Sequence, residues 1–596
     1  MWDSQSKDEV RLPICLVKSH LSWRLSYCVC QIFSACLGMA AIVVFCGCGS
    51  STERTSSEHA SPMRTATELA NTDTNSSTTS NSVPSSNDET VTETVEEMAA
   101  TTSTDSTSHS VGGNAHDVSA QTDSTDPSLF RNSSISTESF VDWPAPLVAL
   151  FVTGRQHGYI EPCGCTGLAN QKGGLARRHT VLETMRGLGW SSIALDVGNQ
   201  VRRFGKQPEI KYQTTINGLR EMKYDVISFG PDDLRLSSDE ILAAVIADEE
   251  DVPFVVANVD IAGFLPTFRV SEVAGRKIGV TSVLGNSHRD RVTDDDLLSV
   301  RDATEALREV RTELVNANCD WYVLLAHASI EESEELARTF PEFDIVVTAG
   351  GAGEPTYQPT EIEGSEAVLV QVGTKGMYAG VIGLYEDAAQ PIKYQRIALD
   401  GSWSDSVAML RLLAGYQQQL EALQLNGLEL HPVVHPSGRQ FVGSEKCGEC
   451  HTKAFDKWVE TPHSHATETL VHPPERYEVP RHFDPECLSC HVTGWNAQGY
   501  YPYRSGYVEL EASQHLRGNG CENCHGPGSQ HVAAEEGESD LDDDQLEALR
   551  DQMKLALADA KENCLKCHDI DNSPDFHVEE AFEKEYWPAI EHIGKD

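Results

Sequence analysis

Basic and apolar residues are both scarce in this sequence, and each shortage limits what the protein can do. The 596 residues carry 46 Lys and Arg against 91 Asp and Glu, a formal net charge of -45, and only 39% are hydrophobic. Nucleic-acid affinity and adsorption to an anionic membrane surface both need a basic face, so this balance excludes them. A partner protein with a basic docking patch is compatible with the charge.

Residues 49–142 lack the marks of a folded segment. They contain no Lys and only three Arg (Arg54, Arg64 and Arg131), and they are rich in Ser, Thr and acidic residues without helical or strand periodicity. Such a segment cannot bury enough apolar surface to offset its chain entropy. We therefore expect a disordered Ser/Thr-rich tether.

An apolar run from about 29 to 45 follows a polar, basic start, and this order is typical of an export signal within residues 1–48. Gly47 before Cys48 resembles the bacterial lipoprotein processing site, which predicts lipidation of Cys48. The alternative is an uncleaved single transmembrane anchor. Both interpretations predict an exported protein, periplasmic or at the cell surface, that is anchored to the membrane.

Between residues 143 and 402, short apolar runs alternate with amphipathic stretches, which predicts an α/β domain with a largely buried sheet. The expected strands are 147–152, 192–197, 225–229, 254–259, 278–283, 321–325, 345–347, 368–372, 380–385 and 392–399. Helices are expected over 174–188, 238–248 and 303–316. A helix over 404–425 then forms a connector, residues 403–440, which ends near Pro432, Pro436 and Gly438.

Cysteine and histidine accumulate after residue 440, where the regular pattern fades. Four segments share the form Cys-x-x-Cys-His. They are Cys447, Cys450 and His451; Cys487, Cys490 and His491; Cys521, Cys524 and His525; and Cys564, Cys567 and His568.

Two thiols three residues apart can add to the two vinyl groups of one haem, and the adjacent histidine then lies beneath the iron as an axial ligand. Zinc sites and redox dithiols need the two cysteines but not the histidine that follows. The pattern therefore predicts four covalent c-type haems in a mostly irregular and helical multihaem domain, residues 441–596.

Ten further histidines between His431 and His592 remain for the sixth coordination site of each iron. A second imidazole gives a haem suited to electron transfer, whereas an open site permits a small molecule to bind or be reduced. The spacing of the residues alone leaves both possibilities open.

The sequence around these sites resembles that of the tetrahaem cytochrome c-554 family of exported electron carriers. The resemblance rests on VGSEKCGECH, Trp458, Thr-Pro-His463-Ser-His465-Ala, CLSCHVTGW and GCENCHGPGSQH, which ends at His531. It implies that His463, with His465 as competitor, and His531 are distal ligands. For the other irons it leaves the candidates His472, His482, His515, His577 and His592, and the family also tolerates a five-coordinate haem.

The region before the connector resembles the 5′-nucleotidase branch of the calcineurin-like metallophosphoesterases, which implies a four-layer αββα fold with a two-metal site on loops after the strands. The matching motifs are Thr153–Gly158, Gly173–Arg178, Leu195–Asn199, Ser228–Asp233, Leu325–His327 and Gly350–Gly353. By this resemblance most metal ligands are lost. Arg155 replaces the first aspartate, Asn199 the bridging aspartate and Pro231-Asp232 an Asn-His pair, while Gly351 and Gly353 replace two histidines.

His157, Asn199, Asp232 and His327 therefore remain as a vestigial site. A cation such as Arg155 opposes the binding of a divalent metal, so we expect no metal there and a scaffold, docking or ligand-binding role. Cys163 and Cys165 follow His157 closely in the sequence. Three interpretations compete: a redox-active disulfide or thiol pair, a soft-metal site with His157 and with His327 as a further candidate ligand, or inert loop cysteines.

The leading hypothesis is an exported multihaem cytochrome that exchanges electrons with a redox partner protein through four haems. Whether the chain is also an enzyme is left open by the sequence. The alternative is a metal-dependent hydrolase of phosphate or sulfur esters that carries a cytochrome domain, and a third possibility is a reductase that uses an open iron site.

Overall fold

The computed structural model describes residues 139–163, 170–246, 252–292, 296–473 and 479–592. The chain divides into two units, 1–116 and 117–596, and all described residues belong to the second. The leader with Cys48, nearly all of the tether, and Cys165 lie outside the described residues. Within the described ranges, no helix has both the length and the apolar character needed to cross a bilayer.

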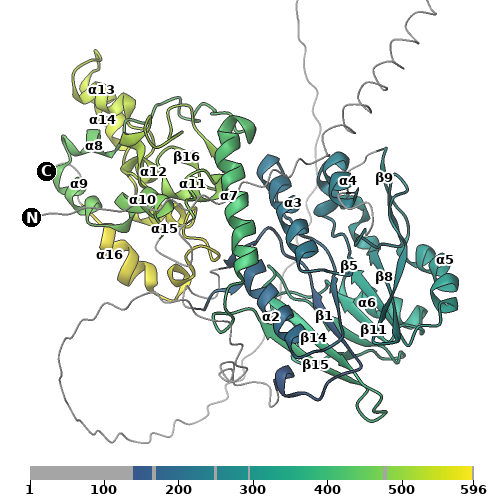
Figure 1. Ribbon diagram of the computed structural model, residues 1–596. Coiled ribbons are helices and arrows are strands. Elements are labelled where there is room, and N and C mark those ends of the chain that lie inside the picture. The colour runs from purple at the N-terminus through teal and green to yellow at the C-terminus, as the bar shows by residue number, and fades with distance from the viewer. Residues whose placement is uncertain (1–138, 164–169, 247–251, 293–295, 474–478, 593–596) are drawn as a thin grey trace, which may run out of the picture. The chain divides into compact units, whose positions relative to one another are not determined.

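Two sheets form the centre of the α/β region (Figure 1). The first has the order β15 (Ile392–Ala398), β14 (Tyr378–Leu384), β1 (Val148–Thr153), β4 (Ser192–Asp196) and β5 (Val226–Ile227). The second has the order β12 (Thr360–Glu361), β13 (Val368–Gln371), β11 (Ile345–Thr348), β10 (Trp321–His327), β8 (Arg276–Leu284) and β7 (Phe268–Val273). Strands β1, β4 and β5 run parallel in one sheet, and β8, β10, β11 and β13 do so in the other.

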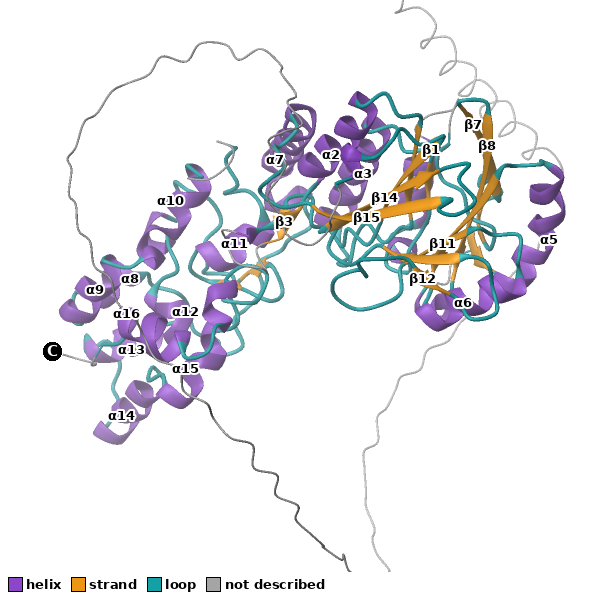
Figure 2. Ribbon diagram, turned by 90° about the horizontal axis from the view of Figure 1, so that it is seen from below, coloured by secondary structure: helices purple, strands orange, loops and turns teal. Residues whose placement is uncertain are grey.

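Alternation along the strands separates the core into layers, as strand β1 illustrates. Its residues Val148, Leu150 and Val152 face the second sheet, while Ala149 and Phe151 face the helices on the outer side. Helices α2 (Leu175–Gly187), α3 (Lys206–Glu221), α4 (Ser238–Ile246) and α7 (Val407–Gly427) contribute to that outer core (Figure 2).

Helices α5 (Ala303–Asn316) and α6 (Ile330–Thr339) pack on the far side of the second sheet. The layers are therefore helix, sheet, sheet and helix, which confirms the expected fold class. The minor strands are β2 (Pro162–Cys163), β3 (Lys172–Gly173), β6 (Val259–Ile261) and β9 (Leu298–Val300).

The expected strand over Phe254–Val259 is wrong. Only a single bridge joins Phe254 to Ile227, and the following amides change partners. Val255 N donates to Ile227 O in the first sheet at 3.1 Å, whereas Ala257 N donates to Ser282 O in the second at 2.8 Å. The segment is buried because it passes between the sheets, and for the same reason it forms no continuous ladder.

The C-terminal region consists of short helices and has few apolar residues at its centre. One cluster includes Phe441, Leu488, Val492 and Trp495, and a smaller one is built on Phe576. The helices are α8 (Ser444–Gly448), α9 (Thr452–Val459), α10 (Ala466–Val471), α11 (Pro485–His491), α12 (Cys521–His525), α13 (Ser529–Glu535), α14 (Asp543–Asp551), α15 (Leu557–Cys564) and α16 (Trp587–Ile590). A hairpin of β16 (Trp495–Asn496) and β17 (Tyr501–Pro502) lies between α11 and α12.

The α/β region contacts the C-terminal region at the start of α11. Asp484 caps α11 by accepting from Glu486 N, and its two carboxylate oxygens also accept from the side chains of Gln207, at 2.6 Å, and Gln417, at 3.0 Å. Next to it, Glu486 pairs with Lys211 of α3 and, at 3.1 Å, with Arg203.

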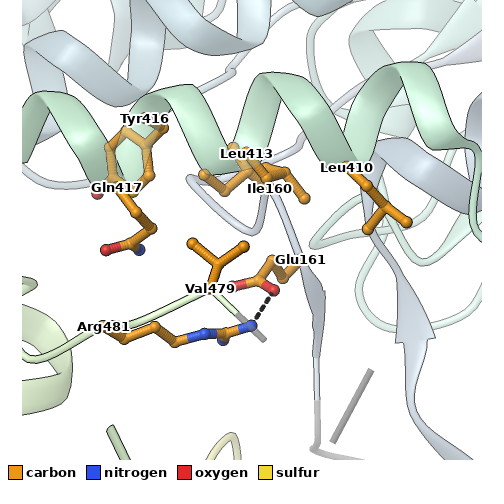
Figure 3. A pocket seen from close by; sticks show the side chains of 8 residues that line it. All are labelled: Ile160, Glu161, Leu410, Leu413, Tyr416, Gln417, Val479 and Arg481. Carbon is orange, nitrogen blue, oxygen red and sulfur yellow. Dashed lines mark hydrogen bonds and ion pairs between the residues drawn. The ribbon is translucent and has the colours of Figure 1, made fainter. Parts of the chain in front are cut away.

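Burial opposes the charge of the Lys211 ammonium, but Glu486 and Asp484 together raise its pKa. Beside this contact, a cavity of about 20 Å³ lies between α7 and the chain at Val479 and Arg481 (Figure 3). Arg481 closes it through an ion pair with Glu161 at 2.6 Å. The second Cys-x-x-Cys-His segment is therefore anchored to the α/β region by buried polar groups.

We predict that Lys211→Met lowers the apparent free energy of unfolding of the haem-loaded protein by about 1.5–3 kcal/mol, because Glu486 loses a charge-assisted hydrogen bond and keeps only Arg203 as its partner. Denaturant titration followed by tryptophan fluorescence measures the change. Lys206→Met is the matched control on the same helix. Lys206 pairs with Glu209 and Glu240 near the surface, so the control should lose no more than about 1 kcal/mol. Equal losses in the two variants would contradict a buried anchor at Lys211.

Candidate functional sites

Each Cys-x-x-Cys-His segment is a turn of helix, and we number the segments one to four in chain order. In the first, Cys450 N and His451 N both donate to Cys447 O, at 3.2 and 2.9 Å, and the fourth repeats this with Cys567 N and His568 N on Cys564 O. Residues three apart on such a turn lie on one side, so both thiols of a segment can reach one planar group. Local hydrogen bonding thus sets the arrangement that the spacing predicts.

Three of the four segment histidines face a second histidine. The ring centres of His451 and His531 are 6.3 Å apart, those of His463 and His568 5.9 Å, and those of His525 and His592 5.8 Å. An imidazole nitrogen binds a metal at about 2 Å. The centre of each ring lies about 1 Å beyond its nitrogen, so the centres of two rings that bind one iron from opposite sides lie about 6 Å apart. All three pairs have the separation that suits one iron between them.

Three of the segment histidines, His525, His491 and His568, also have a partner at Nδ1 that leaves Nε2 to face a metal. Nδ1 of His525 lies 2.7 Å from Met553 O, Nδ1 of His491 lies 2.9 Å from Ala466 O, and Nδ1 of His568 lies 2.8 Å from the Ser573 hydroxyl. A donated Nδ1 proton fixes the tautomer and leaves Nε2 to bind a metal. Burial lowers the pKa of His568 to about 4, with His463 as a second cause, so the ring is neutral.

His491 differs from the other three, because no histidine ring pairs with it in the described part of the chain. The remaining candidates are engaged elsewhere or exposed. His472 is exposed and contacts Glu468, His482 packs on Phe483, and His577 Nε2 lies 2.9 Å from a backbone oxygen, His568 O. His465 and His515 are exposed. The structure therefore places one histidine opposite each of three segments and none opposite the second.

The space for a prosthetic group is present beside the first and third segments. A cavity of about 440 Å³ is lined by residues of both, together with apolar side chains such as Phe455 and Leu555. Its polar lining includes Cys447, Cys450, His451, His531, Cys521, His525 and His592. A planar macrocycle fits this combination of thiols, facing imidazoles and apolar walls.

The order of the segments in space differs from their order in the chain. The Cys447 thiol lies within hydrogen-bond reach of Cys521, and the Cys490 thiol within reach of Cys567. Cys524 and Cys564 are close enough to interact electrostatically. The segments therefore follow one another as first, third, fourth and second.

A second candidate site lies where strands β1, β4, β5 and β10 end, and we call it the strand-end site: Arg155, His157, Asn199, Asp232 and His327. His157 N donates to Asn199 O at 3.1 Å, and the Asn199 side chain exchanges two hydrogen bonds of 3.0 Å with Asp232. His327 Nδ1 lies 2.8 Å from Val197 O. The structure thus brings together the residues that the sequence predicts as a vestigial site.

The carboxylates at and around this site are held by hydrogen bonds and ion pairs to other groups of the protein. Asp196 accepts from Thr153 and Gln200 and pairs with Arg178 at 3.4 Å, while Asp233 accepts four backbone N–H groups. Asp232 pairs with Arg291 at 2.8 Å. In the described ranges no three His, Cys, Asp or Glu side chains gather as a metal site would require.

Both histidines of the strand-end site are neutral at ordinary pH. Burial, with Arg155, Arg202 and Lys375 as smaller causes, lowers the pKa of His157 to about 3. The pKa of His327 falls to about 3 mainly through burial, with smaller contributions from His288 and Arg155. A field that opposes one proton on His157 also opposes a divalent cation. Arg202 and Lys375 have no part in the motifs, and sequence analysis missed both because only the fold brings them to the site.

We predict that millimolar Mn²⁺ neither raises the thermal unfolding midpoint of the haem-loaded protein nor supports hydrolysis of a phosphate monoester, because cations surround the strand-end site. Differential scanning calorimetry and phosphate release measure the two effects. Arg155→Asp combined with Asn199→Asp removes one cation and adds two carboxylates, so this variant should bind Mn²⁺ more tightly than the natural protein. Turnover in the natural protein that disappears in His157→Ala would contradict the prediction.

Comparison with known proteins agrees with the division into two regions. Residues 446–526 match the family described as cytochrome c554 and c-prime. Over 101 residues the chain is 34% identical to cytochrome c-554 of Nitrosomonas europaea, which covers 15% of this chain and 39% of that protein. Over 246 residues it is 22% identical to an apyrase of Aedes aegypti, which covers 36% of this chain and 43% of that protein. The chain thus spans about two fifths of the length of each relative.

Solved structures similar to this chain include a 5′-nucleotidase precursor from Thermus thermophilus, with a TM-score of 0.41, 17% identity, and coverage of 54% of this chain and 66% of that one. Another is the NAD nucleotidase of Haemophilus influenzae, with a TM-score of 0.39, 13% identity, and coverage of 48% and 72%. The C-terminal part of the chain is thus similar to cytochrome c-554, and that family implies c-type haem.

Proposed function

We propose that this protein is an exported multihaem cytochrome that transfers electrons through four covalently bound haems. The observation that carries the proposal is the repeated geometry of the four segments. Each has two thiols and a histidine on one helical turn, and three have a second histidine at the separation that one iron requires. Bound haem would supply an iron that takes up and releases one electron.

The protein's own residues support this role in two ways. Nδ1–H groups donated to backbone or hydroxyl oxygens hold the axial imidazoles in one orientation, so the ligand set changes little when the charge on the metal changes. The segments also lie close together in the order first, third, fourth and second. This order supports one continuous electron path.

A second candidate function is supported by His491. A haem held by Cys487 and Cys490 would have His491 on one side and no histidine opposite it in the described chain. An open iron site can bind a small molecule, whereas two imidazoles exclude one. Binding or reduction of a small molecule at this position would then accompany electron transfer at the other three.

The location and the partner follow from the same proposal. Covalent haem attachment is consistent with the export signal, and either lipid at Cys48 or a single apolar segment would anchor the protein to the membrane. With a net charge of -45, the protein would meet a redox partner through a basic docking patch on that partner. The α/β region would contribute docking or ligand binding.

The direct test of the proposal is the haem content. Pyridine haemochrome analysis of protein matured in a periplasm should give four haems per chain, because each segment attaches one. Replacing both Cys521 and Cys524 with serine should reduce the count to three, while Cys319→Ser, a cysteine outside the segments, should leave four. A count of zero, or an unchanged count in the double variant, would refute the proposal.

We predict three low-spin haems and one high-spin haem in the natural protein, measured by electron paramagnetic resonance of the oxidised form. His531→Ala, His463→Ala and His592→Ala should each convert one low-spin signal to high-spin, because each removes the imidazole opposite a segment histidine. His472→Ala, which changes an exposed histidine, is the control and should change nothing. Four low-spin haems in the natural protein would exclude the open site at His491.

A further inference from the structure

Asp571 lies three residues after His568, the histidine of the fourth segment, and the α/β region holds its side chain. Lys375 pairs with one carboxylate oxygen of Asp571, and the Tyr159 hydroxyl donates to the other. The Lys375 ammonium also lies 5.2 Å from the centre of the Tyr159 ring, so the three side chains form one cluster. Lys375 and Asp571 keep only 15% and 25% of their side-chain exposure, so water screens this pair less than it screens a surface pair.

Both donors stand on loops that the α/β fold fixes. Tyr159 N donates to Gln156 O at 3.0 Å. Lys375 has a positive φ of 56°, which is costly for a residue other than glycine and persists only where the surrounding structure imposes it. The next residue helps to impose it, because Gly376 N donates to Arg155 O at 3.1 Å. The cluster on Asp571 therefore has a fixed base.

Asp571 belongs to a tight turn of the C-terminal region, residues 569–573. The Asp569 carboxylate accepts from Asp571 N at 3.0 Å and from Asn572 N at 2.8 Å. Ser573 N closes the turn by donating to Asp569 O at 2.9 Å. Aspartate side chains that bond the backbone two residues on stabilise such turns. The α/β region therefore holds the whole turn when it holds Asp571.

This turn sets the position of the His568 ring. The Ser573 hydroxyl lies 2.8 Å from His568 Nδ1. Ser573 also begins the short helix that carries Phe576, and the buried Phe576 ring stacks on His568 with the ring centres 4.9 Å apart. A hydrogen bond donated from Nδ1 orients an axial imidazole and makes it a stronger donor to iron. A displaced turn would change both properties.

We propose that Lys375 and Tyr159 are positioning residues for the fourth haem. Through Asp571 they fix the turn that orients His568, and they thereby set the reduction potential of that haem. This inference rests on the proposed function, because it requires a haem on His568. It gives the α/β region a part in electron transfer that needs no metal at the strand-end site.

Redox titration of the full-length, haem-loaded protein, followed by electron paramagnetic resonance, tests this inference. The signal of the fourth haem is the one that His463→Ala converts to high-spin, because His463 faces His568. Lys375→Met combined with Asp571→Asn removes one charge of each sign, so the contact is lost while the net charge is kept. The g values of this signal should change, because they depend on the orientation of the axial imidazoles. The midpoint potential should rise, with about a threefold or larger change in the ratio of reduced to oxidised iron, because a weaker Nδ1 hydrogen bond stabilises ferric iron less.

Two further variants separate positioning from other effects. Arg301→Gln combined with Glu309→Gln is the matched control, because it removes an ion pair of 2.7 Å within the α/β region and also keeps the net charge. It should leave the signal of the fourth haem unchanged. Ser573→Ala should reproduce the shift of the Lys375 and Asp571 double variant, and the two sets of changes together should give no larger shift.

Two results would overturn the inference. One is an unchanged signal and midpoint of the fourth haem in the double variant, and the other is a full additional shift when the double change is added to Ser573→Ala. Pyridine haemochrome analysis separates this inference from the proposed function, since a count of zero refutes both and four haems with an unchanged fourth signal refute the inference alone. If the double variant fails to fold, Tyr159→Phe decides, because it removes one hydroxyl and no charge and should shift the same signal in the same direction.

Discussion

The separation of about 6 Å between facing imidazoles is the constraint on which the C-terminal region depends. This region has only small apolar clusters, so short helices must be held in position by something other than a side-chain core. Thiols and histidines that converge on shared spaces supply that order. Covalently attached haem would add the apolar interior that the amino-acid side chains do not provide.

At the strand-end site, buried carboxylates hold the loops while cationic side chains surround the histidines. Asp196 and Asp233 accept hydrogen bonds from buried backbone and side-chain donors, and in that role they stabilise the loops. Arg155, Arg202 and Lys375 oppose a positive charge on His157, and the same field opposes a divalent cation at these strand ends.

The buried group of Asp484, Glu486 and Lys211 joins these two parts of the molecule. It lies at the first turn of α11, directly before Cys487, so the α/β region contacts the segment whose histidine has no facing histidine ring among the described residues. A second contact, from Lys375 and Tyr159 to Asp571, reaches the loop after the fourth segment. The α/β region is thus linked to the second and fourth segments, while the first and third line the large cavity together with residues of α13 and α14 and with His592.

Local sequence determined the features that depend on neighbours in the chain. The spacing within each Cys-x-x-Cys-His segment sets one helical turn, and alternation of apolar residues sets strands such as Val148–Thr153. The motifs also predicted that Asn199 and Asp232 meet. Tertiary structure alone decided that His592 faces His525, that Phe254–Val259 divides its hydrogen bonds between two sheets, and that Arg202 and Lys375 join the strand-end site. These outcomes depend on groups far apart in the chain, whose distances are set by packing and not by any local pattern.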